Sequence, residues 1–300
     1  MANTSFSPTD IPELLSGLVA FVSSELGWSA SWSSGQAVVT PQSGGATFTL
    51  SEATWGYQAA DSEPSIRMVM TEGADTITTD IADVTSTSQV WLHGGNSPEP
   101  WLMIVVMTEP GVYRLGYLGY IVKYGTWSGG ATVDSCQFGR SSSSIYVWNS
   151  SASHMLFSCN TSWSQSYRRD ENLGGVFVRG VHGESPVVRF CSTTGIYPAD
   201  APRGGGGYVD DYARRASEPG VNPLSGEAAL VPFTLFADML RNGTWTPLGH
   251  VPGIRMMDIS DFDPGSLYSY AGQSWRVFPL ARKTGDPYNT GSLGVAVLEE

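Results

Sequence analysis

Hydrophobic residues change their spacing near residue 27, and this change limits the possible fold more than any other feature of the chain. Before residue 27, apolar residues recur at the i, i+3, i+4 spacing of an amphipathic helix. After it, short runs rich in Val, Ile, Tyr, Phe and Trp alternate with clusters of Gly, Ser, Pro and Asp, which is the pattern of strands and turns. We therefore expect a mainly β (α+β) chain, with an N-terminal helix ahead of an antiparallel, sandwich-like β region and a small C-terminal β unit.

The helix is predicted to begin after Asp10 and to end at Gly27. Aspartate is a preferred helix N-cap, and Pro12 falls in the first turn, where its missing N–H costs nothing. Glycine suits the left-handed conformation that often ends a helix. The apolar positions of this helix are Ile11, Leu14, Leu15, Leu18, Val19, Val22 and Leu26.

The rest of the chain is predicted to form short strands. The stretch TPQSGGAT, residues 40–47, is typical of a hairpin loop, and the longest apolar run, WLMIVVM at 101–107, has the length of a buried strand. No apolar run approaches the ~18 residues of a membrane span. The last part of the chain predicts a hairpin of Leu267–Tyr270 with Ser274–Leu280 that turns at Ala271-Gly272-Gln273. The other predicted strands are Ala37–Thr40, Ala46–Leu50, Ile66–Thr71, Trp101–Met107, Val112–Tyr124, Ser144–Trp148, His154–Cys159, Gly175–Val181, Val187–Cys191, Leu230–Phe236, Ile254–Met257 and Gly294–Leu298.

Residues 192–227 are rich in proline and contain a run of four glycines, which is typical of a long loop or linker. They predict a division into a helix plus central β region (1–191), this loop (192–227) and a C-terminal β unit (228–300). The loop could also be an arm that orders against a neighbouring subunit. The residues predicted to lie at such an interface are Gly204, Gly205, Gly206, Gly207, Tyr208, Trp127 and Trp275.

The charge of the chain disfavours two classes of partner. With 16 Lys and Arg against 28 Asp and Glu, the net charge is −12 and the pI about 4.7. Binding to nucleic acid or to an anionic membrane needs clustered basic residues, so neither partner is expected. The three cysteines (Cys136, Cys159, Cys191) form no CxxC pair and are odd in number. Together with the missing signal-peptide pattern, they favour free thiols and assembly in a reducing cytoplasm.

Three carboxylates, Asp258, Asp261 and Asp263, fall within six positions just before Pro264-Gly265. An EF-hand loop is matched only in part, because Gly265 falls one position early and no glutamate follows at the required place. A glycosidase needs two carboxylates facing each other across a substrate, which a single loop rarely provides. The favoured interpretation is a solvated turn, for which Asp and Pro-Gly are suited.

Other polar clusters match no catalytic motif. His182, Glu184 and Ser185 are residue types used in acyl transfer, but the chain has no G-x-S-x-G, so a hairpin loop is favoured. The histidines at 93, 154 and 250 show no metal-ligand spacing. The glycine run lacks the lysine of a phosphate loop, and Asp210-Asp211 with Arg214-Arg215 favour local ion pairs on a short helical turn. We expect no catalytic residue, metal or cofactor.

Several tryptophans are flanked by serine and glycine, as in GWSASWSSG and NTSWSQS. Exposed tryptophans next to small polar residues can stack on sugars, whereas in β proteins most fill cores and subunit interfaces. The second interpretation is favoured. The tryptophans considered are Trp28, Trp32, Trp127, Trp148, Trp163, Trp245 and Trp275.

Two stretches resemble virion proteins of tailed bacteriophages. VYRLGYLGYIVKYGTWSGGATVDS (112–135) resembles a strand with the pattern G-x-[IL]-x-K-[YF]-G that continues into an aromatic residue and Gly-Gly. PLGHVPGIRMMDIS…PGSLYSYAGQSWRVFPLARK (247–283) resembles their C-terminal unit, G-x-[LV]-P-G-[IV]-[RY], a loop, a small hairpin and [WY]-x-V-F-P. The matching positions of the first stretch are Gly119, Lys123, Tyr124, Gly125, Trp127, Gly129 and Gly130.

This resemblance implies a virion structural protein of the tail, neck or baseplate and carries over no catalytic residue. Its partners would be other virion proteins and copies of itself in a ring with three- or six-fold multiplicity, assembled in the host cytoplasm. The alternatives are a glycan-binding or glycan-cleaving protein at the tail tip, which needs exposed tryptophans in a groove near paired carboxylates, and a cytoplasmic β-rich enzyme.

Overall fold

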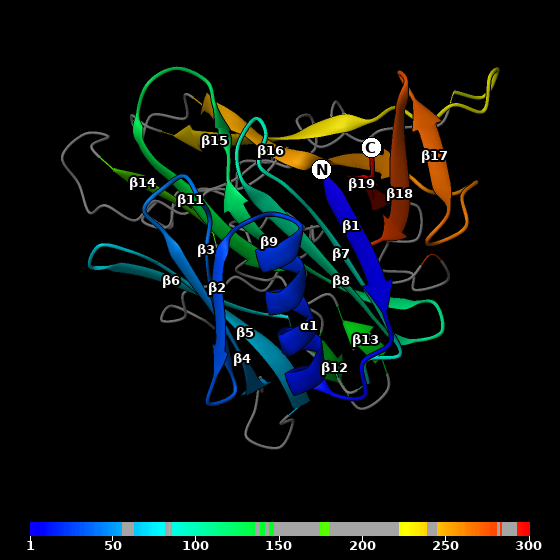
Figure 1. Cartoon of the computed structure of the whole chain (residues 1–300). Helices are drawn as coiled ribbons and strands as arrows, with labels where there is room; N and C mark the ends of the chain where they lie inside the picture. The colour runs from blue at the N-terminus through cyan, green and yellow to red at the C-terminus, as the bar shows by residue number, and fades with distance from the viewer. Residues whose placement is uncertain are drawn as a thin grey trace.

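The computed structural model is built from three antiparallel sheets and one helix among the residues it describes (Figure 1). We call the sheets A, B and C. The mainly β (α+β) class with an N-terminal helix is thus confirmed. The described residues are 1–55, 63–81, Val84, 86–135, 139–141, 144–146, 175–179, 222–238, 245–280, Lys283 and 293–300.

Sheet A is the middle layer. It consists, in spatial order, of β1 (Ala2–Phe6), β7 (Gln89–Gly95), β8 (Trp101–Glu109), β9 (Val112–Tyr120), β11 (Ser128–Ser135) and β14 (Gly175–Arg179). Every residue of β9 is buried, and so is nearly every residue of β8. Alternate residues of these strands belong to two different hydrophobic cores, so both faces of the sheet are covered.

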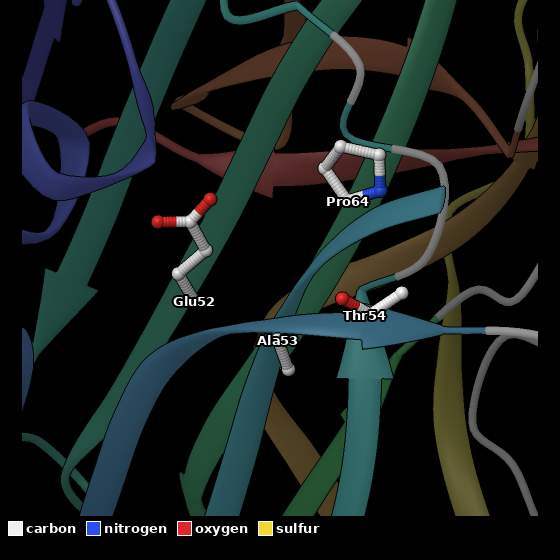
Figure 2. A pocket seen from close by; sticks show the side chains of 4 residues that line it. All are labelled: Glu52, Ala53, Thr54 and Pro64. Carbon is white, nitrogen blue, oxygen red and sulfur yellow. The ribbon is translucent and has the colours of Figure 1, made fainter. Parts of the chain in front are cut away.

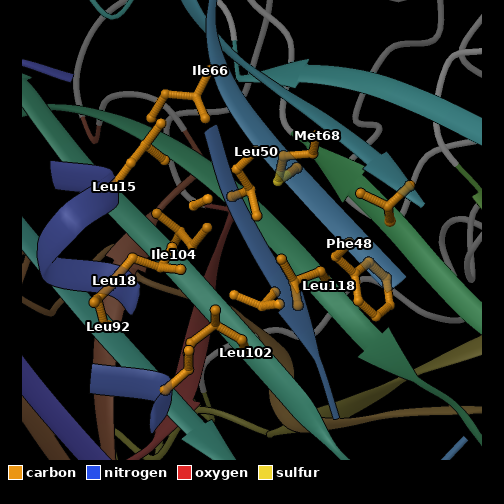
Figure 3. Packing of buried hydrophobic residues seen from close by; sticks show 14 of the residues in the cluster. Leu15, Leu18, Phe48, Leu50, Ile66, Met68, Leu92, Leu102, Ile104 and Leu118 are labelled. Atoms are coloured by element: carbon orange, nitrogen blue, oxygen red, sulfur yellow. The ribbon is translucent and has the colours of Figure 1, made fainter. Parts of the chain in front are cut away.

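Sheet B and the helix cover one face of sheet A. The strands of sheet B, in spatial order, are β2 (Ser29–Ser33), β3 (Gln36–Thr40), β4 (Thr47–Trp55), β5 (Glu63–Glu72) and β6 (Asp75–Ile81). The helix α1 (Ile11–Ser24) packs against them and against sheet A. Figure 3 shows this core: Leu15 and Leu18 of α1 lie near Leu50, Ile66 and Met68 of sheet B and Leu92, Leu102, Ile104 and Leu118 of sheet A. Along β3 and β4, sheet B is buried on this face only.

Sheet C covers the other face of sheet A. Five of its strands are, in spatial order, β10 (Val122–Lys123), β16 (Trp245–Asp258), β19 (Leu293–Leu298), β18 (Gln273–Pro279) and β17 (Leu267–Tyr270). The sixth strand, β15 (Val231–Asp238), also pairs with β16. Its inner face shares a core with Trp101, Met103 and Tyr117 of sheet A. Its outer face carries a smaller core that includes Trp275 and Val277. A short hairpin, β12 (Gly139–Ser141) with β13 (Ser144–Tyr146), lies apart from the three sheets.

The helix and several hairpins form as predicted. The Asp10 carboxylate accepts a hydrogen bond from the Glu13 N–H at 2.8 Å, which caps the helix, and the Glu13 carboxylate accepts one from the Thr9 N–H at 2.6 Å just before the cap. The loop 40–47 joins β3 to β4, as expected. The C-terminal hairpin turns at Ala271-Gly272, and Trp275 and Val277 point away from the face of Arg276.

Other elements differ from the prediction. The strand predicted at Val112–Tyr124 is two strands, because the chain leaves sheet A at Ile121 and continues in sheet C as β10. Ile254–Met257 is part of the longer β16, which begins at Trp245. Six strands were not predicted from the sequence, and all are rich in polar residues or glycine: β1, β2, β6, β7, β11 and β12. The strands predicted at His154–Cys159 and Val187–Cys191 and all three cysteines lie outside the described residues.

Candidate interaction surface

The structure brings together residues 112–135 and 247–283, the two stretches with the quoted patterns. They are more than 100 residues apart in sequence, yet β10 pairs with β16 so that Val122 lies opposite His250 and Lys123 opposite Gly249. The Tyr117 hydroxyl also donates a hydrogen bond to the Pro252 carbonyl at 3.3 Å. The two stretches therefore form one structural unit at the corner between sheets A and C.

The Leu248 carbonyl organises this corner. It accepts a hydrogen bond from the Tyr124 N–H at 2.7 Å and another from Trp127 Nε1 at 3.2 Å. Lys123 Nζ donates to the Trp127 carbonyl at 3.0 Å and lies 4.8 Å from the centroid of the Trp127 ring, within cation–π range. The indole is thus fixed both at its edge and over its face.

Glycines make this close approach possible. A Cβ at Gly249 would lie 2.3 Å from the Val122 carbonyl oxygen, so no larger residue fits beside β10. Gly125 and Gly130 adopt positive φ angles of 88° and 107°, which other residues rarely adopt. The repeated glycines of the phage-like pattern therefore have a backbone function here.

The outer part of this corner is open to solvent. Tyr124 is 45% exposed, and its ring lies 5.6 Å from that of His250. Lys123, Trp127 and His250 are half-buried. Burial, and then the positive charge of Arg255, lowers the pKa of His250 below its usual value, so the imidazole is neutral at pH 7. We call these four residues the junction surface: Lys123, Tyr124, Trp127 and His250.

The predicted interface residues have different environments. Trp127 is part of the junction surface. Trp275, in contrast, is 2% exposed and packs in the outer core of sheet C, with Arg255 5.4 Å from its ring centroid. Its side chain has no surface to offer a partner, which corrects the expectation for this residue. Gly204, Gly205, Gly206, Gly207 and Tyr208 lie outside the described residues, as do Asp210, Asp211, Arg214 and Arg215.

The carboxylates of the 258–263 loop have separate environments. Asp258 Oδ1 accepts hydrogen bonds from the Ser260 N–H at 2.8 Å and from its hydroxyl at 2.5 Å, so Asp258 stabilises its own turn. Asp261 and Asp263 are exposed. Within the part of the chain that the structure describes, no three His, Cys, Asp or Glu side chains are grouped closely enough to hold a metal ion.

His93 is a buried polar residue that sequence analysis considered only as a metal ligand. It lies on β7 with 1% exposure, between sheets A and C, 3.7 Å from a Glu299 carboxylate oxygen. Burial, and then the positive charge of Arg276, lowers its pKa from 6.5 to about 3. The imidazole is therefore neutral at pH 7, and the contact with Glu299 is not a salt bridge. Glu299 instead pairs with Arg276. His154, His182, Glu184 and Ser185 lie outside the described residues.

A hollow of about 370 Å³ lies where β4 ends and β5 begins (Figure 2). It is lined by Glu52, Ala53, Thr54 and Pro64. Among the described residues that line it, a single carboxylate lies beside small side chains, which provides neither an acid–base pair nor an apolar pocket.

The tryptophans whose side chains the structure describes do not form the exposed groove that a glycan site needs. Among the tryptophans whose side chains the structure describes, Trp28, Trp101 and Trp275 are buried and Trp32, Trp91 and Trp127 are half-buried. Trp148 and Trp163 lie outside the described residues, and for Trp245 only the backbone is described. The described aromatic residues thus favour packing over sugar stacking.

No helix in the described ranges is both long and apolar enough to cross a membrane. Comparison with protein-family models and with curated proteins finds no match for this chain.

Proposed function

We propose that the chain is a structural subunit of a tailed-bacteriophage particle. It would form a symmetric oligomer in the tail, neck or baseplate, contact other virion proteins, and assemble in the host cytoplasm. One observation supports this proposal above the others. The two stretches that resemble virion proteins pack together, and they present the half-exposed aromatic side chains of Tyr124 and Trp127 at a rigid corner.

The junction surface has the composition of a protein contact. Tyr and Trp are enriched at interfaces because they bury a large area with few rotatable bonds. Here the hydrogen bonds to Leu248 and the Lys123 side chain already hold the Trp127 ring, so little side-chain entropy remains to be lost on binding. This pre-organisation favours a subunit contact over a mobile surface.

The oligomeric state tests the proposal. Negative-stain electron microscopy and mass photometry of the purified protein should show rings whose subunit number is a multiple of three or six. Mass spectrometry of purified particles of the phage that encodes this chain should find the protein in them at a matching copy number. A strictly monomeric protein that is absent from the particles would contradict the proposal.

A pair of variants locates the contact. Tyr124→Arg places a bulky charge at the junction surface and should shift the protein from rings to monomers. Gln36→Arg adds the same charge at an exposed position of sheet B and should leave the rings intact. If both variants form rings equally well, the contact lies elsewhere.

A further inference from the structure

Sheet C ends in an edge strand that has no partner among the described residues on its outer side. This strand, β17, has four residues and pairs only with β18. Natural sheets usually protect such edges with a charged side chain, a proline or a bulge. The sequence of β17, Leu-Tyr-Ser-Tyr, contains neither a charge nor a proline. The edge is therefore open to strand addition.

The hydrogen bonds of β18 show which backbone groups of β17 do not bond to β18. The Ser274 carbonyl accepts a hydrogen bond from the Glu299 N–H at 2.9 Å, so the backbone of Ser274 points away from β17. The Val277 N–H donates to the Ser266 carbonyl at 3.0 Å, so Val277 points toward it. This alternation is that of an antiparallel ladder.

Ser269 lies opposite Ser274, and Leu267 opposite Arg276. Both are non-hydrogen-bonded pairs, because the β18 partner points its backbone at β19. The N–H and C=O groups of Leu267 and Ser269 therefore face the open edge, ready to bind an added strand.

The side chains of β17 add apolar surface on both faces. Leu267 is 56% exposed, on the face shared with Arg276, and Tyr270 is 41% exposed, on the face shared with Trp275. The Tyr268 ring contacts that of Phe262 at 4.9 Å and faces the same way as Tyr270. An added strand would meet an aliphatic side chain on one face and tyrosine rings on the other.

The surroundings of this edge are acidic. Asp261 and Asp263, in the loop that leads into β17, are exposed. The negative charge of Glu227, also exposed, contributes to the raised pKa of Tyr268.

The nearby positive charge of Arg276 is already neutralised, because its guanidinium pairs with Glu299 and donates to the Gly265 carbonyl at 2.7 Å. A second copy of this chain, with its net charge of −12, would bring like charges together at this edge.

We propose that β17 docks an extended, basic segment of a different protein by strand addition. Alternate side chains of that segment would point to opposite faces of sheet C. Apolar side chains would cover Leu267, and Lys or Arg side chains would lie over Tyr268 and Tyr270, within reach of the acidic groups. This inference goes beyond the proposed function, since it holds whatever assembly the chain belongs to.

A labelled peptide tests the docking edge. The probe is a capped peptide of roughly eight residues that alternates valine and arginine, long enough to span β17. Its control has glutamate in place of arginine. Fluorescence anisotropy should show that the arginine peptide binds and that the glutamate peptide does not. Hydrogen exchange on the complex should show new protection at Leu267 and Ser269.

Two substitutions at Ser269 separate strand addition from simple charge attraction. Ser269→Pro removes an N–H that faces the open edge without breaking a hydrogen bond to β18, and should weaken peptide binding about tenfold. Ser269→Ala keeps this N–H and should bind as the wild type does. Circular dichroism checks that both variants fold. As a second measurement, the Asp261→Asn/Asp263→Asn variant should bind a few-fold more weakly, with a smaller salt dependence.

Three outcomes would overturn the proposal. The first is equal binding of both peptides, and the second is binding of the arginine peptide that Ser269→Pro leaves unchanged with no protection in β17. The third is a homodimer that Ser269→Pro dissociates, with no peptide binding, which would identify a second copy as the occupant.

Discussion

Sheets A and B are both antiparallel, yet their strands read differently in the sequence. In sheet B, β3 and β4 alternate between buried residues such as Leu50 and half-exposed residues such as Thr49. In sheet A, β8 and β9 are apolar almost without interruption. The difference follows from what covers the strands: β3 and β4 pack on one side only, whereas β8 and β9 lie between two cores. Continuous apolar runs, which are usual in parallel sheets, thus also mark an antiparallel sheet that is covered on both faces.

An alanine scan of neighbouring positions gives the largest expected effect. In β8, Met103 and Ile104 are adjacent but face different cores, so replacing either with alanine should lower the free energy of unfolding by about 2–5 kcal/mol. In β4, Leu50→Ala should cost a similar amount, whereas Thr49→Ala should cost less than about 1 kcal/mol. Urea titration measures all four. A small loss of unfolding free energy from either Met103→Ala or Ile104→Ala would contradict the interpretation that β8 is covered on both faces.

Acid should destabilise the interior between sheets A and C through His93. Its pKa is about 3 in the folded protein and 6.5 when unfolded, so the unfolded state binds the extra proton first. The contribution of the neutral His93 to the free energy of unfolding is complete above pH 6.5. As the pH is lowered from 6.5 to about 3, this contribution falls by roughly 1 kcal/mol per pH unit. In His93→Leu this part of the pH dependence should disappear, as urea titrations from pH 8 to pH 4 would show.

His250→Asn is the control for this experiment. His250 is only half-buried, so its removal should leave most of the slope in place. If His93→Leu keeps the slope of the wild type, the enclosed site between sheets A and C is more open to water than its burial indicates.

The contact between sheets A and B depends on a missing side chain. A Cβ at Gly116 of β9 would lie 2.4 Å from Cδ1 of Ile81 and 3.2 Å from Cε of Met68. Gly116→Ala should therefore cost about 1–3 kcal/mol through overpacking. Ile81→Val, which removes the clashing methyl group, should recover part of this loss in a double-mutant cycle. Gly45→Ala, whose Cβ would meet only Glu72 atoms at an ordinary 3.7 Å, is the control and should be close to neutral.

The smallest expected effect concerns two hairpin turns, one in sheet B and one in sheet C. Ser34 and Ala271 both occupy positive φ angles, 52° and 51°, ahead of a glycine. Replacing either with glycine relieves the strain of a side chain in this conformation and should stabilise the protein by about 0.5–1 kcal/mol. Equal gains in the melting transition would indicate that the sheets unfold together. A gain from only one turn would indicate that they unfold separately.

The parts of the fold that could be predicted are those with local causes. The Asp10 cap, the helical spacing from Ile11 to Val22 and the Ala271-Gly272 turn each act within a few residues. In contrast, the sequence of β11, SGGATVDS, is typical of a loop. In β1, half-buried residues alternate with exposed ones, and no residue is fully buried. These strands form because neighbouring strands offer them backbone partners, which a local pattern cannot show.

Part of the junction surface could be predicted from the sequence. The phage-like pattern indicated Lys123, Tyr124 and Trp127, but nothing in the sequence paired them with Leu248 and His250, more than 120 residues away. Trp275 was predicted as an interface residue, whereas its side chain is buried within the chain. It belongs to a hydrophobic cluster with Ala228 and Ile259, which are distant in the sequence and come together only in the fold.

The central claim about this fold is that sheet A, enclosed by the other two sheets, is its most stable layer. Native-state hydrogen exchange tests this claim most directly. The account predicts that amides of β8 and β9 exchange slowest, and only through global unfolding, since both faces must separate before either strand is exposed. Slower exchange in sheet B or sheet C than in β8 and β9, or exchange of β8 through a local opening, would contradict it.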